Sequence, residues 1–139
     1  MKHTGTMEFT VGWGDCSPSG AVFYPNYFRW FDSGMWNFFD QADWPLREIE
    51  AKHGNVGLPL IETHVNFKGP YRLHDLLRLE TSITNIARKT LNMSHTLFNG
   101  DTVAIEASDV RFWGIKHPED SGRLKAAPIP DEVAAYFGK

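Results

Sequence analysis

Ten aromatic residues fall within the short segment from Phe23 to Trp44, and this crowding limits what the chain can fold into more than any other feature. A helix on a protein surface buries one apolar stripe and leaves its other side to solvent. Large aromatic side chains spread around a helix therefore need other elements to enclose them on most sides. The sequence predicts a central helix with the rest of the chain wrapped around it.

Helix start and stop signals divide this part of the chain into two helices. Pro25 fits the first turn of a helix, where its missing N–H costs nothing, and the apolar spacing predicts a helix that continues to about Phe39. Gly34 lies inside this helix at a cost of roughly 1 kcal/mol relative to Ala, which indicates a close backbone approach at that point. A second, shorter helix is expected to begin near Pro45 and to end near Gly54.

Apolar and polar residues alternate through most of the remaining chain, which is the pattern of half-buried strands. The expected strands cover residues 7–13, 61–67, 76–86, 89–98 and 103–113. Asn99-Gly100 is a strong hairpin signal, and a short amphipathic helix is expected from Pro130. This order predicts an α+β fold in which an antiparallel, curved sheet wraps around one long central helix.

Length and charge favour one domain without a nucleic-acid or membrane partner. The 139 residues, 42% of them hydrophobic, suit a single domain over residues 1–139. The formal net charge is −3 and there is no long basic run, so we expect no nucleic-acid-binding surface. No apolar stretch approaches the ~20 residues of a membrane span. The one cysteine, Cys16, excludes an internal disulfide and suits a reducing compartment, so we expect a cytoplasmic protein.

The common cofactor and nucleophile motifs do not occur in the sequence. It contains neither a Gly-rich phosphate-binding loop nor a G-x-S-x-G nucleophile elbow. Glu50 and His53 have the spacing of half a carboxylate-bridged metal site, but such sites need a second copy of the motif on long helices. We therefore expect no metal and no cofactor. Cys16 has no histidine nearby in sequence, and we interpret it as a small buried hydrophobe.

The segment from Gly14 to Asp32 carries a long motif of uncommon residue types. It reads GDCSPSGAVFYPNYFRWFD, and it resembles the G-D-C-D-P-[AS]-G, Y-P-N-Y and R-W-[LF]-D pattern of the hotdog-fold acyl-CoA thioesterases, in particular the 4-hydroxybenzoyl-CoA thioesterase subgroup. Fainter similarity continues over nearly the whole chain. The resemblance implies a hotdog fold and a dimer with active sites at the subunit interface. Pairing of exposed sheet edges also favours a homodimer, or a homotetramer.

The activity that this resemblance implies is hydrolysis of an aromatic or short-chain acyl-CoA to the free acid and CoA. Attack on the thioester places negative charge on the carbonyl oxygen, and a backbone N–H at a helix N-terminus can stabilise that charge. The resemblance assigns this donor to the backbone N–H of Tyr24, since Pro25 has none. An ordinary capping role for Tyr24-Pro25 is the alternative. Tyr27 and Asp32, in the same motif, are candidate substrate-binding residues.

Ser17 departs from the motif where the family carries its catalytic carboxylate. A serine cannot act as a general base at neutral pH, and as a nucleophile it needs a neighbouring base. Three alternatives follow. Ser17 orients a water while another group is the base, or the protein binds acyl-CoA without rapid turnover, or Ser17 caps a turn.

Four residues are candidates for a substitute base: Asp15, Asp32, Glu62 and His64. Asp15 lies in the loop itself, where a carboxylate often binds the turn instead. Glu62 and His64 share one face of the expected strand 61–67, which could line the interface cleft. A histidine with an ordinary pKa near ~6.5 suits base catalysis at neutral pH, although a hydrogen-bonded structural role is the common alternative.

Arg88 and Lys89 lie at the turn between two expected strands, where the resembling enzymes place basic residues for the nucleotide end of CoA. The fork of Arg88 can hold a phosphate by two hydrogen bonds. A solvated hairpin tip explains the same two residues.

Two other classes of function remain as alternatives. A non-catalytic acyl-CoA-binding or scaffolding protein would explain the serine at position 17. The motif is also similar to the G-D-x-N-P-x-H pattern of hotdog hydratases and dehydratases. Gly20 stands where that pattern has its catalytic histidine, so this class is disfavoured.

Overall fold

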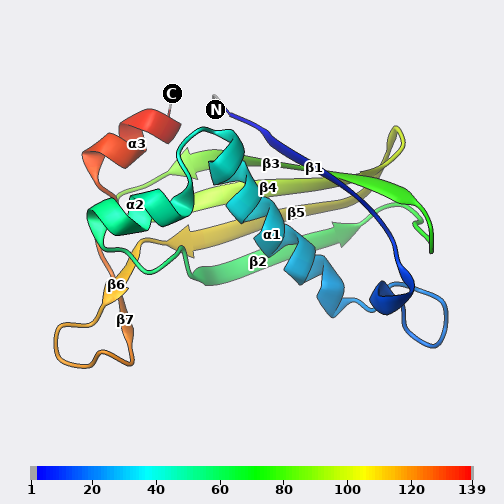
Figure 1. Cartoon of the computed structure of the whole chain (residues 1–139), viewed down its shortest axis with the longest axis horizontal. Coiled ribbons are helices and arrows are strands. Elements are labelled where there is room, and N and C mark those ends of the chain that lie inside the picture. The colour runs from blue at the N-terminus through cyan, green and yellow to red at the C-terminus, as the bar shows by residue number, and fades with distance from the viewer. Residues whose placement is uncertain (1–2, 139) are drawn as a thin grey trace.

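The computed structural model describes residues 3–138, in which a long helix lies across one face of a five-stranded antiparallel sheet (Figure 1). The strands are β1 (Gly5–Thr10), β2 (Leu60–Phe67), β3 (Leu76–Ile86), β4 (Thr90–Asn99), β5 (Thr102–Phe112), β6 (Gly114–Lys116) and β7 (Leu124–Ala126). The helices are a 3₁₀ turn η1 (Trp13–Asp15), α1 (Pro25–Gln41), α2 (Leu46–His53) and α3 (Asp131–Phe137). The sheet has the strand order β1-β3-β4-β5-β2, and β6 and β7 form a separate hairpin. The predicted sheet around a central helix is confirmed.

The face of the sheet that meets α1 is apolar because the strands alternate as the sequence predicts. Every second residue is buried from Leu77 to Ile83 in β3 and from Leu91 to Leu97 in β4. Most of these buried residues are leucine, isoleucine or methionine, and the two polar exceptions are Thr81 and His95. Phe31, Met35 and Phe38 of α1 pack onto this face and are at most 2% exposed. One turn of α1 comes especially close to β3, since a Cβ on Gly34 would lie 2.7 Å from Cδ2 of Leu79. The close approach predicted at this glycine is confirmed.

The expectation that α1 is enclosed on most sides is wrong for one stripe of the helix. Tyr24 is 65% exposed and Phe28 is 40% exposed, and the side chain of Asp32 is 57% exposed. With Trp36, these residues are spaced four apart and so lie in a row along one face of α1. The sheet of one chain covers only the opposite side of the helix, which leaves this row open.

Two local predictions also need correction. The first strand ends at Thr10 rather than at residue 13, and Trp13 lies in η1 with 77% exposure. Gly12 and Gly14 flank Trp13, and the carboxylate of Asp15 accepts a hydrogen bond from the backbone of Gly12, which favours a tight turn over a strand. The β6–β7 hairpin was not predicted, because strands of three residues are too short to show alternation.

β2 is an edge strand whose outer side is unpaired within the described residues. It pairs only with β5, and it exposes three large apolar side chains, Leu60, Ile61 and Phe67. No helix within residues 3–138 is long and apolar enough to cross a membrane.

Candidate active site

The loop before α1 is held in place by Asp15. The carboxylate of Asp15 accepts one hydrogen bond from the backbone N–H of Gly12 and another from Arg29, each at 2.9 Å. Its backbone carbonyl accepts from the side chain of Asn26 at 2.9 Å and from the N–H of Phe23 at 2.8 Å. Both carboxylate oxygens are thus engaged in shaping the loop. This geometry favours the turn-binding alternative for Asp15 over a role as base.

Ser17 begins a small hairpin that projects beside the start of α1. Cys16 and Val22 form an isolated antiparallel bridge, and the N–H of Ser17 donates to the carbonyl of Ala21 at 2.7 Å. The hydroxyl of Ser17 lies 2.7 Å from the hydroxyl of Ser19. A hydroxyl can accept and donate at once, so this contact leaves Ser17 able to bind a water.

The N-terminus of α1 offers one free backbone donor. The N–H of Phe23 is taken by the carbonyl of Asp15, and Pro25 has no N–H. Among the described residues, the N–H of Tyr24 between them has no hydrogen-bond partner. An unpaired donor at the positive end of a 17-residue helix is suited to hold a developing negative charge.

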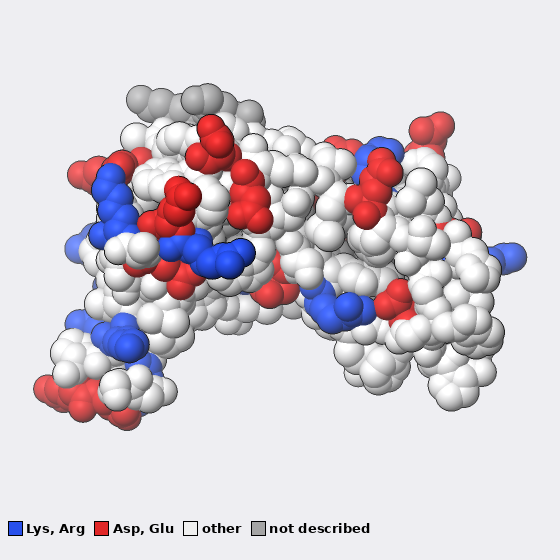
Figure 2. Space-filling view, viewed as in Figure 1, with Lys and Arg blue, Asp and Glu red and all other residues white. Residues whose placement is uncertain are grey.

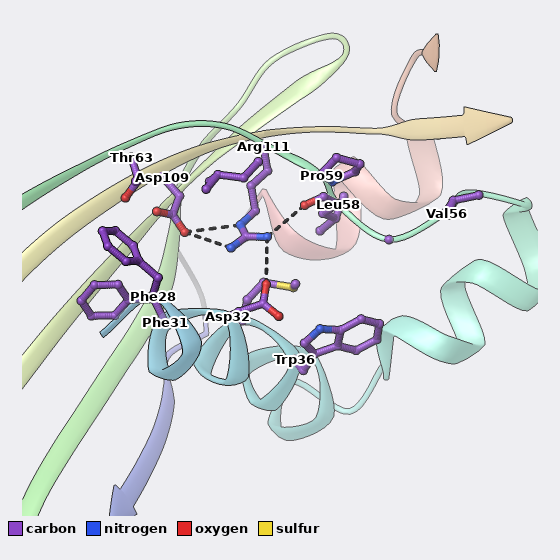
Figure 3. Close-up of a pocket in the computed structure, with 13 residues that line it drawn as sticks. Phe28, Phe31, Asp32, Trp36, Val56, Leu58, Pro59, Thr63, Asp109 and Arg111 are labelled. Atoms are coloured by element: carbon purple, nitrogen blue, oxygen red, sulfur yellow. Dashed lines mark hydrogen bonds and ion pairs between the residues drawn. The ribbon is translucent and has the colours of Figure 1, made fainter. Parts of the chain in front are cut away.

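A pocket of about 310 Å³ opens along the exposed row of α1 (Figure 3). The helix provides one wall with Phe28, Asp32 and Trp36, and the segment from Val56 to Leu60 provides the opposite wall. The pocket is therefore mostly apolar at its sides and carries a carboxylate from α1.

The floor of the pocket holds a buried guanidinium, that of Arg111 on β5. Its side chain is 6% exposed, and it donates to one carboxylate oxygen of Asp109 at 3.2 Å and 3.4 Å. It also donates to the carbonyl of Leu58 at 3.0 Å and to Asp32 at 3.4 Å (Figure 3). Arg111 thus connects the strand, the 56–60 segment and the helix.

Behind Arg111, Asp109 is paired with a buried histidine. The Nε2 of His95 lies 2.8 Å from Asp109, its Nδ1 lies 3.0 Å from the hydroxyl of Thr81, and its ring stacks on Phe31 at 5.2 Å between centroids. Burial on its own raises the pKa of Asp109, but the hydrogen bond from His95 and the charge of Arg111 outweigh it and lower that pKa. Asp109 is therefore ionised in the folded protein at neutral pH.

Sequence reasoning missed this cluster, although a signal for it was present. Ile105 and Ala107 point toward α1, and the same alternation places Asp109 and Arg111 on that apolar face. Charged residues at core positions of a strand are uncommon unless they are paired.

Three of the predicted site residues, Tyr27, Glu62 and His64, do not line this pocket. Tyr27 is buried, its hydroxyl is paired with that of Tyr71, and burial raises the pKa of both phenols. His64 lines a groove of about 340 Å³ on the opposite face of the sheet from α1, beside Glu106 and Ser108. Glu62, two residues before His64, is also exposed. Neither Glu62 nor His64 lines the pocket beside α1.

Arg88 and Lys89 occupy the turn between β3 and β4, as expected. The turn is braced from behind, since the carbonyl of Arg88 accepts from Ile129 at 2.8 Å and that of Lys89 accepts from Trp113 at 2.9 Å. On the face shown in Figure 2, Lys and Arg side chains are interspersed with Asp and Glu, without a continuous basic surface.

No group of three or more His, Cys, Asp or Glu side chains within residues 3–138 is arranged to hold a metal ion. Glu50, half of the weak metal motif, lies beside the N–H of Gly57 at 3.4 Å. His53, the other half, faces Glu132 of α3 at 3.2 Å.

Comparison with known proteins decides the family. The model of the thioesterase-like superfamily matches residues 11–137 of this chain. The chain belongs to this superfamily. It is 31% identical over 136 residues to 4-hydroxybenzoyl-CoA thioesterase of Pseudomonas sp. strain CBS-3, with 94% of each sequence covered.

Solved thioesterases of the superfamily share the fold. A crystal structure of an aspartate-to-asparagine variant of 4-hydroxybenzoyl CoA thioesterase, complexed with 4-hydroxybenzoyl CoA, matches with a TM-score of 0.87 at 28% identity, over 97% of this chain and 99% of that one. A gentisyl-coenzyme A thioesterase matches with a TM-score of 0.78 at 28% identity, over 96% and 99%. The predicted hotdog fold and the predicted family are confirmed.

Proposed function

We propose that this protein hydrolyses the thioester of an aromatic acyl-CoA and releases the free acid and CoA. Its membership of the thioesterase-like superfamily supports the reaction. The observation that carries the substrate class is the open row on α1, which begins at the free N–H of Tyr24 and leads into the pocket at Asp32. A thioester carbonyl bound at Tyr24 directs its acyl group along this row.

The length of the row fits one aromatic ring. Tyr24 and Asp32 are eight residues apart, which is about 12 Å along a helix axis at ~1.5 Å per residue. A hydrogen bond at each end takes about 3 Å, and the roughly 6 Å that remain match a six-membered ring with a para substituent. Phe28 and Trp36 provide flat apolar surface beside this space.

The reaction needs a stabilised oxyanion and an activated water. The N–H of Tyr24 and the positive end of α1 supply the first. We assign the second to the hydroxyl of Ser17, which orients a water toward the carbonyl without being a base itself. Because Asp15 is engaged and Asp32 lies about two helical turns from Tyr24, this arrangement predicts slower turnover than a carboxylate at position 17 would give.

We further propose that the working unit is a homodimer, or a tetramer built from dimers. The support is the unpaired edge of β2 and its exposed apolar side chains, which a second copy would cover. Glu62 and His64 lie on this strand, and pairing at the edge would place them near the partner rather than near their own loop.

At the other end of the substrate, we propose that Arg88 and Lys89 contact the phosphates of CoA. The braced turn supports this role, since it fixes the backbone from which both side chains extend. The reaction requires no cofactor in this scheme. A cytoplasmic location, suggested by the single cysteine, also remains part of the proposal.

A non-catalytic acyl-CoA-binding protein is the second candidate, and Ser17 is the observation that favours it. In that case the pocket and Tyr24 would hold the acyl group, while no group would activate water.

A panel of thioesters tests the proposal. Release of free CoA is followed with benzoyl-, 4-hydroxybenzoyl-, phenylacetyl- and hexanoyl-CoA, together with a benzoyl thioester that lacks the nucleotide, and binding of each is measured in parallel. We expect turnover of the one-ring substrates, with a raised KM for the thioester without a nucleotide. Tight binding of all aromatic substrates without CoA release would instead establish the binding protein.

A further inference from the structure

One leucine separates the pocket on α1 from the apolar core behind it. Leu58 is 3% exposed, and among residues 3–138 it alone lines both the pocket and a second, smaller cavity. We propose that Leu58 is a specificity-determining residue, whose side chain closes the pocket toward the core and so excludes acyl groups longer than one ring. This inference rests on the proposed function, because it concerns the acyl group in the same pocket.

Leu58 lies in the wall opposite α1, at the level of Asp32. The Nη1 of Arg111 donates to the carbonyl of Leu58 at 3.0 Å and lies 3.4 Å from Asp32, so both residues meet at one guanidinium (Figure 3). An acyl group that extends from Tyr24 along the helix therefore reaches Leu58 after about two helical turns. What lies behind this leucine decides whether a longer group fits.

The cavity behind Leu58 is small and suited only to hydrocarbon. It measures about 10 Å³, and its eleven lining residues are all aliphatic or aromatic. A space of this size without polar partners does not hold an ordered water. The cavity walls include Phe39 of α1, Leu46 of α2 and Phe137 of α3. The methylene groups of an acyl chain would be stabilised here, because they would leave water for an apolar surface.

The backbone on both sides of Leu58 is fixed, so the size of its side chain sets the boundary. The N–H of Val56 donates to the carbonyl of Gly114 at 2.7 Å, and the carbonyl of Pro59 accepts from the N–H of Phe112 at 3.0 Å. The carbonyl of Leu58 itself is held by Arg111. A packed interior yields little to an added methylene. A chain end thus enters the cavity only if residue 58 is smaller than leucine.

Binding of two non-hydrolysable CoA thioethers, one with a phenacyl group and one with a decyl group, tests the proposal by calorimetry. We expect the wild-type protein to bind the phenacyl thioether at least about tenfold more tightly, since a pocket can discriminate to this extent by one methylene. Leu58→Ala should move the ratio of the two affinities by at least about tenfold toward the decyl thioether. Leu58→Val, which removes only one methylene, should move it the same way by a smaller factor.

Leu46→Ala is the matched control. Leu46 is 1% exposed, and it lines the cavity but not the pocket. Its truncation enlarges the same cavity while Leu58 still closes it, so the wild-type ratio should be kept. Leu58→Val carries the test if Leu58→Ala fails to fold. An equal shift in Leu46→Ala, or an unchanged ratio in the folded Leu58 variants, would overturn the proposal.

The readout separates this inference from the proposed hydrolysis. Equal binding of both thioethers by the wild-type protein overturns the role of Leu58 and leaves thioester hydrolysis standing. A ratio that responds to Leu58, without CoA release from benzoyl-CoA, supports the role of Leu58 and overturns hydrolysis. If neither thioether binds, both proposals are wrong.

Discussion

At the scale of single residues, we expect Ser17 to limit the rate of the proposed hydrolysis. Its hydroxyl can orient a water but cannot take a proton from it at neutral pH. Its backbone is fixed by the hydrogen bond to Ala21, so a longer acidic side chain at this position would point in a defined direction.

Ser17→Asp is expected to raise kcat for an aromatic acyl-CoA by about 10²-fold or more, since a positioned general base typically contributes that much. The measurement is steady-state CoA release by the folded variant. Ser17→Asn, of equal size but without a charge, is the control and should not show the gain. Unchanged activity in a folded Ser17→Asp protein would mean that position 17 does not face the thioester.

The ionised carboxylate of Asp109 makes the free energy of unfolding depend on pH in the acid range. Its pKa is lowered in the folded protein, whereas an unfolded aspartate titrates near ~3.9. The stabilisation from this group is thus present above about pH 4 and is lost as the pH falls through the lower, folded value.

Asp109→Asn is expected to cost about 3 kcal/mol at pH 7, because it leaves Arg111 buried without its partner. The variant should also lose less stability than the wild type between pH 5 and pH 3. Urea unfolding at several pH values measures both effects, with Asp101→Asn at the exposed β4–β5 turn as the control. Parallel pH dependences of wild type and variant would contradict the assignment.

The residues of the site were only partly accessible to sequence reasoning. The motif between Gly14 and Asp32 predicts Tyr24 and Asp32 as candidate site residues. The buried cluster was missed because Arg111, Asp109 and His95 come from two strands and meet only through the register of β4 and β5. Glu62 and His64 were placed on a shared strand face, but which side of the sheet that face would take depends on packing that the pattern does not specify.

At the scale of elements, α1 is the part on which fold and site both depend. Its buried stripe packs on the sheet through Gly34, and its open row forms a wall of the pocket. The helix and the long strands were predictable because each shows several repeats of its period. The end of β1 and the β6–β7 hairpin were not, since turn residues and three-residue strands carry too few repeats.

Gly34→Ala is expected to destabilise the protein by up to about 2 kcal/mol. The helix gains roughly 1 kcal/mol in propensity, but the new methyl would lie 2.7 Å from Leu79 and 2.9 Å from Thr81, and overpacking typically costs about 1–3 kcal/mol. Thermal or urea unfolding measures the change. Ser33→Ala, at the neighbouring exposed position, is the control and should stay within about 0.5 kcal/mol of wild type. A stabilised Gly34→Ala protein would show that α1 can shift away from β3.

At the scale of the whole molecule, we expect a second copy of the chain to cover surfaces that one chain leaves open. One chain leaves the row on α1 and the edge of β2 uncovered. Both features carry large apolar side chains, which single soluble chains rarely expose together in continuous patches.

Sedimentation analysis should therefore give the mass of a dimer or tetramer. Ile61→Lys places a charge on the exposed edge of β2, where Ile61 is 54% exposed, and is expected to shift the equilibrium toward monomer. Asp101→Asn changes the net charge by the same +1 at a distant turn and should not. A wild-type protein that remains monomeric at high concentration would rule out an interface at this edge.

We propose that the row from Tyr24 to Asp32 accommodates one aromatic ring. The most direct test is the ratio of kcat/KM for 4-hydroxybenzoyl-CoA to kcat/KM for a two-ring naphthoyl-CoA, measured with the wild-type protein. We predict a ratio of about ten or more, because the proposed row has no room for a second ring before Asp32. A ratio near one, or a preference for the two-ring substrate, would contradict it.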